Sequence, residues 1–377
     1  MGVLRLFLAL VVALGHYKYY HPNDPINFPA FMTLGMNGGT AVMFFLIISG
    51  FLMSYSLNTK YEDSVGGNYR YFKSRFIRIF SLYWPLYFFA LFFILGFSVW
   101  IQRPLLDNFL TFILLGSDWY LSFADYPEKW GYVSLFMPGT QQSWTLATEV
   151  TFYCIAPFIL RSTRTVIALF VMSLAIRFPL VYVFGFYEAW NYYFFPTILF
   201  FFLLGHLARV FFLRFYLNPI IGVMFLIPAF SFSIMGVGKP FDSIYLYLSA
   251  GCFAASLPSV FLLTKNNRLS NFMGNFSYPL YLSHSILLLY YGHIPFIRLI
   301  EPAKLYPWLG NYITDDVFLN LTVGALITVL VVTVAALVHY SIERPVYWFM
   351  CFIAKHIEAG YQASVTQLKT IEKKWMN

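Results

Sequence analysis

The stretch LRLFLALVVALGHYKYY, residues Leu4 to Tyr20, determines how the rest of the chain is interpreted. It is apolar over nearly the length that one bilayer-spanning helix needs, yet it contains Arg5 and His16. Charge is costly in hydrocarbon, so an ionisable residue inside a membrane span indicates a functional site. The two residues are separated by very nearly three helical turns, which places them on one helix face about 16 Å apart. The stretch therefore predicts a membrane helix that handles a long polar ligand.

The overall composition indicates an integral membrane protein. Of 377 residues, 60% are hydrophobic and 11% are charged, whereas soluble domains carry about 25% charged residues. Membrane topology explains the net charge of +8 better than nucleic-acid binding does, so membrane lipids are expected as partners and nucleic acid is not. Cys154, Cys252 and Cys351 are far apart in or beside apolar stretches, which favours neither a disulfide framework nor a metal site. The first apolar run has no small-residue cleavage site after it and is interpreted as a retained anchor.

Apolar windows along the chain predict an all-α polytopic membrane fold. About ten windows are long enough to be spans: 3–20, 38–57, 79–99, 144–160, 165–185, 193–214, 218–236, 243–263, 276–296 and 317–340. Seventeen Lys and Arg residues fall in the predicted inner segments and five in the outer loops, so both termini are expected to be cytoplasmic. The expected organisation is one membrane domain, residues 1–345, followed by a short cytoplasmic tail, residues 346–377.

The first candidate cluster joins His16 to Glu149 near the predicted outer surface. Glu149 follows the start of its window by five residues, and His16 precedes the end of the first span by four. Both side chains are thus expected about 6–8 Å below the outer surface. A carboxylate beside an imidazole would fix its tautomer and raise its basicity, as a general base requires. The alternative is a structural hydrogen bond between two packed helices.

The second cluster, Arg75 and Arg78, lies at the predicted inner surface. The two residues are spaced i and i+3, so they share one face if helix has begun there. Two guanidinium groups on one face suit bidentate contacts with phosphates. Ordinary positive-inside anchoring is the alternative, and for these charges taken alone it is the stronger one.

Other polar and aromatic residues are candidates for lining the cavity. Tyr281 and His284 are spaced i and i+3 near mid-membrane, and Trp144 and Tyr153 flank Glu149 on its own window. A buried histidine bonded to a neighbouring helix is an equal alternative for His284. The aromatic-rich segment 100–143 is a candidate cover for the outer mouth of the cavity, although aromatic residues are also common at membrane interfaces.

Several segments, taken in chain order, resemble the acyltransferase 3 family of integral-membrane acyltransferases. The matching motifs are Arg5-x10-His16, the run Val42 to Leu52, Arg75-x-x-Arg78-Ile79 with Tyr83-Trp84, the run Trp144 to Pro157, Gly205, Ser277-Tyr278-Pro279-Leu280-Tyr281-Leu282-x-His284 and Glu343-x-Pro345. The resemblance covers residues 3–345. The chain departs from the family pattern at Met43, where an acidic residue is usual, and at Ser81, where proline is frequent. Neither position carries a proposed catalytic group.

The resemblance implies transfer of an acyl group, often acetyl, from cytoplasmic acyl-CoA to a hydroxyl of a cell-envelope glycan or similar acceptor, in a bacterial inner membrane. It implies that His16 is catalytic, that Glu149 supports catalysis, and that Arg5, Arg75 and Arg78 handle the donor. Acyl-CoA is then a co-substrate, and no permanently bound cofactor is expected. Two mechanisms stay open for His16. It acts as a general base on the acceptor hydroxyl, or it is acylated first and passes the acyl group on. The rival function is a transporter or flippase of a polysaccharide or lipid-linked substrate, although such proteins often show two related halves and this sequence shows no repeat.

Overall fold

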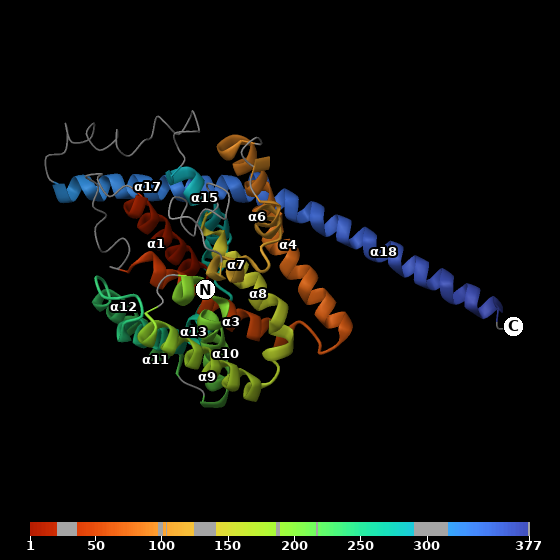
Figure 1. Cartoon of the computed structure of the whole chain (residues 1–377), viewed down its shortest axis with the longest axis horizontal. Helices are drawn as coiled ribbons and strands as arrows, with labels where there is room; N and C mark the ends of the chain where they lie inside the picture. The colour runs from red at the N-terminus through yellow and green to blue at the C-terminus, as the bar shows by residue number, and fades with distance from the viewer. Residues whose placement is uncertain are drawn as a thin grey trace.

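Helices make up the regular structure of the chain. The computed structural model describes residues 1–20, 36–96, 101–102, 104–123, 141–185, 189–215, 218–289 and 316–375, and no strand occurs in these ranges (Figure 1). The α-helices are α1 (Gly2–Tyr20), α3 (Gly38–Thr59), α4 (Val65–Ala90), α6 (Leu105–Ile113), α7 (Ser117–Phe123), α8 (Trp144–Ile159), α9 (Thr163–Phe178), α10 (Phe195–Phe215), α11 (Pro219–Met224), α12 (Leu226–Met235), α13 (Ile244–Thr264), α14 (Arg268–Gly274), α15 (Ser277–Leu289), α17 (Asp316–Val338) and α18 (Arg344–Trp375). The π-helical segments are η1 (Leu91–Leu95), η4 (Pro179–Val183), η5 (Ala189–Tyr193) and η8 (His339–Glu343), and η3 (Gln141–Ser143) is a 3-10 turn. The all-α prediction is confirmed for the described residues.

The chain has the apolar helices of an integral membrane protein. Among the described residues, six helical segments are long and apolar enough to cross a bilayer: Gly38–Thr59, Val65–Ile94, Thr163–Val183, Trp190–Phe215, Ile244–Thr264 and Phe318–Ala359. Shorter apolar helices cover Gly2–His16, Trp144–Ile159 and Pro219–Met235. The membrane class therefore holds, whereas ten crossings and two cytoplasmic termini stay predictions.

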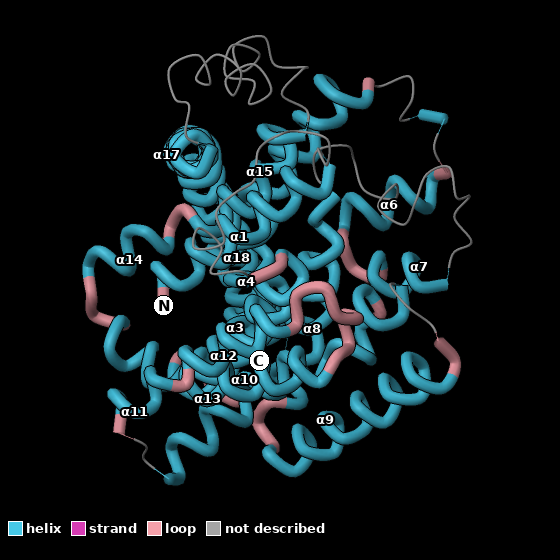
Figure 2. Tube along the Cα trace, turned by 90° about the vertical axis from the view of Figure 1, so that its left-hand side faces the viewer, coloured by secondary structure: helices cyan, strands magenta, loops and turns pink. Residues whose placement is uncertain are grey.

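The centre of the bundle is built on α3, which packs against α10 on one side and α1 on the other, while α15 covers α1 (Figure 2). Two glycines bring α3 and α10 into backbone contact. A Cβ added to Gly50 would lie 1.8 Å from the carbonyl oxygen of Phe202, and one added to Gly205 would lie 2.0 Å from that of Ile47. Small residues permit such close approach between membrane helices. This seam sets the position of Ser49, the residue before Gly50.

A buried ion pair joins α9 to the start of α13. Arg177, fully buried, places Nη2 2.5 Å from Oδ1 of Asp242, and Asn191 donates to the other carboxylate oxygen. Arg177 also donates to the backbone carbonyls of Asn191 and Thr197. Arg177, an arginine inside an apolar helix, is thus paired with a carboxylate. A buried charge is tolerated only when it is paired and hydrogen-bonded, so these contacts hold α9 against the residues that precede α13.

Helix α4 carries the two arginines of the second cluster. Ser64 caps its N-terminus by accepting a hydrogen bond from the backbone N–H of Gly67 at 3.0 Å, so helix has begun well before Arg75. The predicted shared face of Arg75 and Arg78 therefore exists. Helices α17 and α18 are continuous through η8, and α18 extends beyond the bundle (Figure 1). It packs on α4, where Lys73 Nζ lies 2.5 Å from Glu358 Oε1.

Candidate functional site

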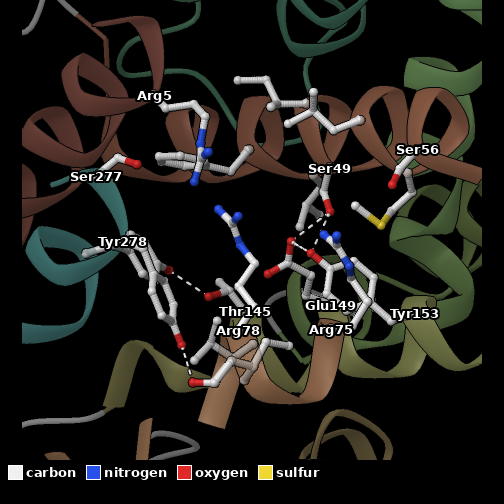
Figure 3. Close-up of a pocket in the computed structure, with 18 of the residues that line it drawn as sticks. Arg5, Ser49, Ser56, Arg75, Arg78, Thr145, Glu149, Tyr153, Ser277 and Tyr278 are labelled. Carbon is white, nitrogen blue, oxygen red and sulfur yellow. Dashed lines mark hydrogen bonds between the residues drawn. The ribbon is translucent and has the colours of Figure 1, made fainter. Parts of the chain in front are cut away.

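The candidate site is a cavity of about 300 Å³ inside the bundle (Figure 3). Five helices supply its polar lining: α1, α3, α4, α8 and α15. The polar and charged side chains are Arg5, Ser49, Tyr55, Ser56, Lys60, Arg75, Arg78, Thr145, Glu149, Tyr153, Ser277, Tyr278 and Tyr281. Lys60 follows the last residue of α3, so the cavity reaches the end of the bundle that the charge pattern places in the cytoplasm.

Three arginines give the cavity a strong excess of positive charge. Arg5 and Arg78 direct their guanidinium groups toward each other from opposite walls, and Arg75 lies beside Tyr153 (Figure 3). Within the described ranges, no carboxylate forms an ion pair with any of the three. With Lys60 the lining holds four basic side chains and the single carboxylate of Glu149. Guanidinium groups stay charged in proteins, so this lining suits an anion carrying several charges.

The carboxylate of Glu149 is held by two hydroxyl groups. Ser49 donates to Oε1 at 2.7 Å, and Tyr153, one turn further along α8, donates to the same oxygen at 2.5 Å. The close backbone contact between α3 and α10 at Gly50 positions the neighbouring residue Ser49. The expected contact between Glu149 and His16 is wrong, because the structure gives each of them a different partner and includes only Glu149 in the cavity lining.

The reason is the depth at which α8 begins. Gln142, just before α8, donates to the backbone carbonyl of Leu282 at 2.6 Å and accepts from Ser285 at 2.7 Å. The start of α8 is thus level with the middle of α15 and not at the predicted outer surface. Glu149 is seven residues further on, roughly 10 Å along the helix axis. This displacement places Glu149 with the arginines instead of with His16.

His16 meets His284 instead. Nδ1 of His16 lies 2.8 Å from Nε2 of His284, and the two rings are nearly parallel, with an interplanar angle of 13°. His284 is fully buried. One turn closer to the arginines on α15, the hydroxyl of Tyr281 lies 2.8 Å from that of Thr145. The polar residues therefore form a series from the arginines, through Glu149 and Tyr281, to the histidine pair.

The remaining predicted lining residues divide into two groups. Tyr153 and Tyr281 line the cavity, as expected. Trp144 packs instead against Tyr192 and Tyr193, with ring centroids 4.6 and 4.8 Å away. Most of the aromatic segment expected at the outer mouth, residues 124–140, lies outside the described residues.

Comparison with known protein families decides the family. The sequence model described as "Acyltransferase domain", that of acyltransferase 3, matches residues 1–340 of the 377. The chain belongs to the acyltransferase 3 family. No curated protein and no solved structure matches this acyltransferase.

Sequence reasoning assigned no role to several polar residues of the acyltransferase 3 site. Ser49 and Tyr278 line the cavity, and Tyr278 ties α15 to α4 by donating to the carbonyl of Ile79 at 2.7 Å. Gln142 fixes the start of α8. Lys60 adds a fourth positive charge. A usable signal existed for Ser49, because a hydroxyl beside a glycine in an apolar span is a frequent feature of close helix contacts.

Proposed function

We propose that this acyltransferase transfers an acyl group, acetyl in the simplest case, from acyl-CoA to a hydroxyl of a cell-envelope glycan or similar acceptor. The donor would enter from the cytoplasm, and the acceptor would lie at the outer side of a bacterial inner membrane. The observation that carries the proposal is the cavity wall, with four basic side chains, one carboxylate and no ion pair to the arginines among the described residues. Phosphate groups are the ligands that such a guanidinium cluster suits best.

The donor would extend from the arginines of the cavity along α1 toward His16. Its phosphates would lie between Arg5 and Arg78, with Arg75 and Lys60 nearer the mouth. The pantetheine arm would then follow α1 past Glu149 and Tyr281. Arg5 and His16 are about 16 Å apart along one helix, so the thioester would approach His16 while the phosphates stay at the arginines.

The chemistry at His16 would be acyl transfer by general base catalysis. A ring nitrogen of His16 takes the proton of the acceptor hydroxyl as the oxygen attacks the thioester carbonyl carbon. The carbon–sulfur bond then breaks, and the CoA thiolate leaves and takes up the proton. Glu149 supports the reaction from the donor side, where its charge and its bonds to Ser49 and Tyr153 order the wall that the thioester passes.

The test uses membrane vesicles of known orientation with labelled acetyl-CoA supplied only on the cytoplasmic side. Wild type is compared with His16→Ala and Arg75→Ala at equal expression. Arg70→Ala is the matched control, because Arg70 is on the same helix as Arg75 but is exposed and pairs with Glu62 outside the cavity. Wild type and Arg70→Ala are expected to label envelope glycan, and the other two variants are not.

The outcomes separate the candidate activities. Equal labelling by His16→Ala removes His16 from the mechanism, and equal labelling by Arg75→Ala removes the arginine site. Absence of label in wild type, together with movement of a glycan or lipid-linked sugar across the vesicle, would establish the transporter instead.

A further inference from the structure

The contact between His16 and His284 has the geometry of a hydrogen bond between two imidazole rings. The ring centroids are 5.1 Å apart and the bonded nitrogens 2.8 Å apart. The first distance exceeds the second by about the sum of the two ring radii. The imidazoles therefore meet edge to edge in nearly one plane. This arrangement aligns an N–H of one ring with the in-plane lone pair of the other, as a strong hydrogen bond requires.

The surroundings of His284 fix the direction of that bond. Nδ1 of His284 lies 3.2 Å from the carbonyl oxygen of Leu280. A carbonyl only accepts, so Nδ1 of His284 carries the proton and, in the neutral ring, Nε2 carries the lone pair. The proton between the two rings must then come from Nδ1 of His16.

A second residue pair removes the main competitor for the same lone pair. The hydroxyl of Ser285 lies 3.4 Å from Nε2 of His284, close enough to donate to it. Its single proton instead goes to Oε1 of Gln142, at 2.7 Å. The amide of Gln142 is oriented by its own donation to the carbonyl of Leu282 at 2.6 Å. The hydroxyl proton of Ser285 is therefore donated to Gln142, and Nε2 of His284 accepts the proton of Nδ1 of His16.

We infer that His284, held by Gln142 through Ser285, is a positioning residue that keeps His16 in the tautomer with its proton on Nδ1 and its lone pair on Nε2. The inference rests on the proposed function for its catalytic meaning. The lone pair on Nε2 is what a general base needs, and it is equally what a nucleophilic histidine needs. When Nε2 takes the acceptor proton, the Nδ1–H of His16 stays bonded to His284, which stabilises the imidazolium that forms.

His284 thus has the orienting role that the sequence pattern predicts for Glu149. In a hydrolytic triad a carboxylate orients the histidine, and loss of the correct tautomer there costs about 10⁴-fold in kcat, a value from that other system. A neutral histidine in the same place carries no permanent charge. It therefore orients His16 without adding a buried carboxylate to this part of the bundle.

The first experiment reads the tautomer directly. Purified protein with ¹⁵N-labelled histidine is studied by NMR, and His16→Gln identifies the His16 signals among the seven histidines. The expected result is a protonated Nδ1 and an unprotonated Nε2 on His16 in wild type. Proton on Nε2 of His16 in wild type would overturn the proposal.

Two substitutions at His284 separate positioning from packing. His284→Gln keeps an oxygen that accepts from Nδ1 of His16, and His284→Leu removes every acceptor at similar size. His284→Leu is expected to lose about 100-fold or more in kcat, in line with the contribution of a correctly placed base, and to show a mixture of His16 tautomers. His284→Gln should restore both the tautomer and most of the activity. Equal kcat and equal tautomer in both variants would contradict the inference.

Gln142→Leu provides a test that leaves both histidines in place, in case His284→Leu does not fold. It frees the hydroxyl of Ser285 to donate to His284, so the Nδ1–H tautomer of His16 should become less populated. An unchanged tautomer in Gln142→Leu would show that the hydrogen bonds from Gln142 through Ser285 to His284 do not determine the tautomer of His16. The NMR measurement needs no acyl transfer. If the wild type transfers no acyl group, the proposed function is wrong. The NMR measurement of the His16 tautomer still tests the role of His284.

Discussion

Arg5 and Arg78 point their guanidinium groups at each other across the cavity (Figure 3). One is on the first helix of the chain and the other on α4. Two like charges facing each other in a membrane bundle are unfavourable until an anion lies between them. The arrangement is therefore one that a polyanionic ligand stabilises.

Arg78→Gln is expected to abolish the stabilisation of the purified protein by CoA. At 100 times its Kd, a ligand that binds only the folded state adds about 2.7 kcal/mol, which appears as a rise in Tm. Wild type should show this rise, and so should the exposed variant Arg70→Gln on the same helix. Without CoA, Arg78→Gln should be at least as stable as wild type, because the repulsion of Arg5 is gone. If CoA raises the Tm of Arg78→Gln as much as that of wild type, Arg78 does not bind CoA.

His16→Ala and Glu149→Gln are expected to affect different properties. Glu149 is in the cavity wall with the arginines and His16 is at the histidine pair. His16→Ala should lower kcat about 10²–10⁴-fold, as loss of a general base does, and leave the Kd of CoA unchanged. Glu149→Gln should lower the Kd of CoA, because it removes the one negative charge that repels the phosphates.

Tyr153→Phe is the control for this pair of variants. It removes a hydrogen bond to Glu149 without changing the charge of the cavity, so the Kd of CoA should stay near that of wild type. Calorimetric titration of each variant with CoA supplies the affinities. Weaker CoA binding by His16→Ala would show that the histidine belongs to the donor site.

Gly50→Ala is expected to destabilise the fold by about 1–3 kcal/mol, the usual cost of overpacking a close contact. The added methyl group would meet the backbone of Phe202, which has no side-chain freedom to yield. Gly251→Ala on α13 is the matched control, because nothing lies within 4 Å of its Cβ position. Alanine there should be neutral or slightly stabilising, since it favours helix over glycine. Thermal unfolding in detergent measures both, and equal Tm values would show that the seam is not tight.

Asp118 predicts a pH-dependent stability. It is on α7, outside the candidate membrane spans, and burial raises the pKa of its carboxyl to about 7, although Thr151 donates to one of its oxygens at 3.1 Å. The folded protein thus holds this proton at pH values where the unfolded chain has released it. Stability from this group is full below about pH 4 and declines as the pH rises through about 7.

Asp118→Asn should remove that decline and make the protein more stable than wild type at pH 8. The measurement is Tm between pH 5 and 8, the range in which the carboxyl loses its proton. Thr151→Val is the companion variant, since it removes the hydrogen bond that favours the charged form and should extend the decline to higher pH. Parallel Tm curves for wild type and Asp118→Asn would show that Asp118 does not titrate in this range.

The sequence predicted those features that depend on local pattern. Apolar windows mark helices because a bilayer leaves the backbone few alternatives. The i, i+3 spacing of Arg75 and Arg78 put them on one face, an inference that needs only the geometry of one helix. The family resemblance, and not helix geometry, grouped Arg5 with them, and all three line one cavity.

The misplaced pair of His16 and Glu149 shows where local pattern stops being sufficient. A hydropathy window gives the length of an apolar segment, but not the depth at which its helix starts beside its neighbours. The bonds of Gln142 to α15 set that depth, and they join residues 140 or more positions apart in the chain. The partner of His16 was equally hidden, because His284 is 268 positions away.

The unbroken helical path from Asp316 to Trp375 also has a consequence for dimensions. At 1.5 Å per residue it is roughly 90 Å long, about three times the thickness of a bilayer's hydrocarbon core. A single crossing accommodates only part of that length, so part of this helical path lies outside a crossing of the hydrocarbon core. Because α18 packs on the helix that bears Arg75 and Arg78, it extends outward from the wall that carries these two arginines. A fluorophore near the far end of α18 would therefore lie outside the cavity and leave its lining unchanged.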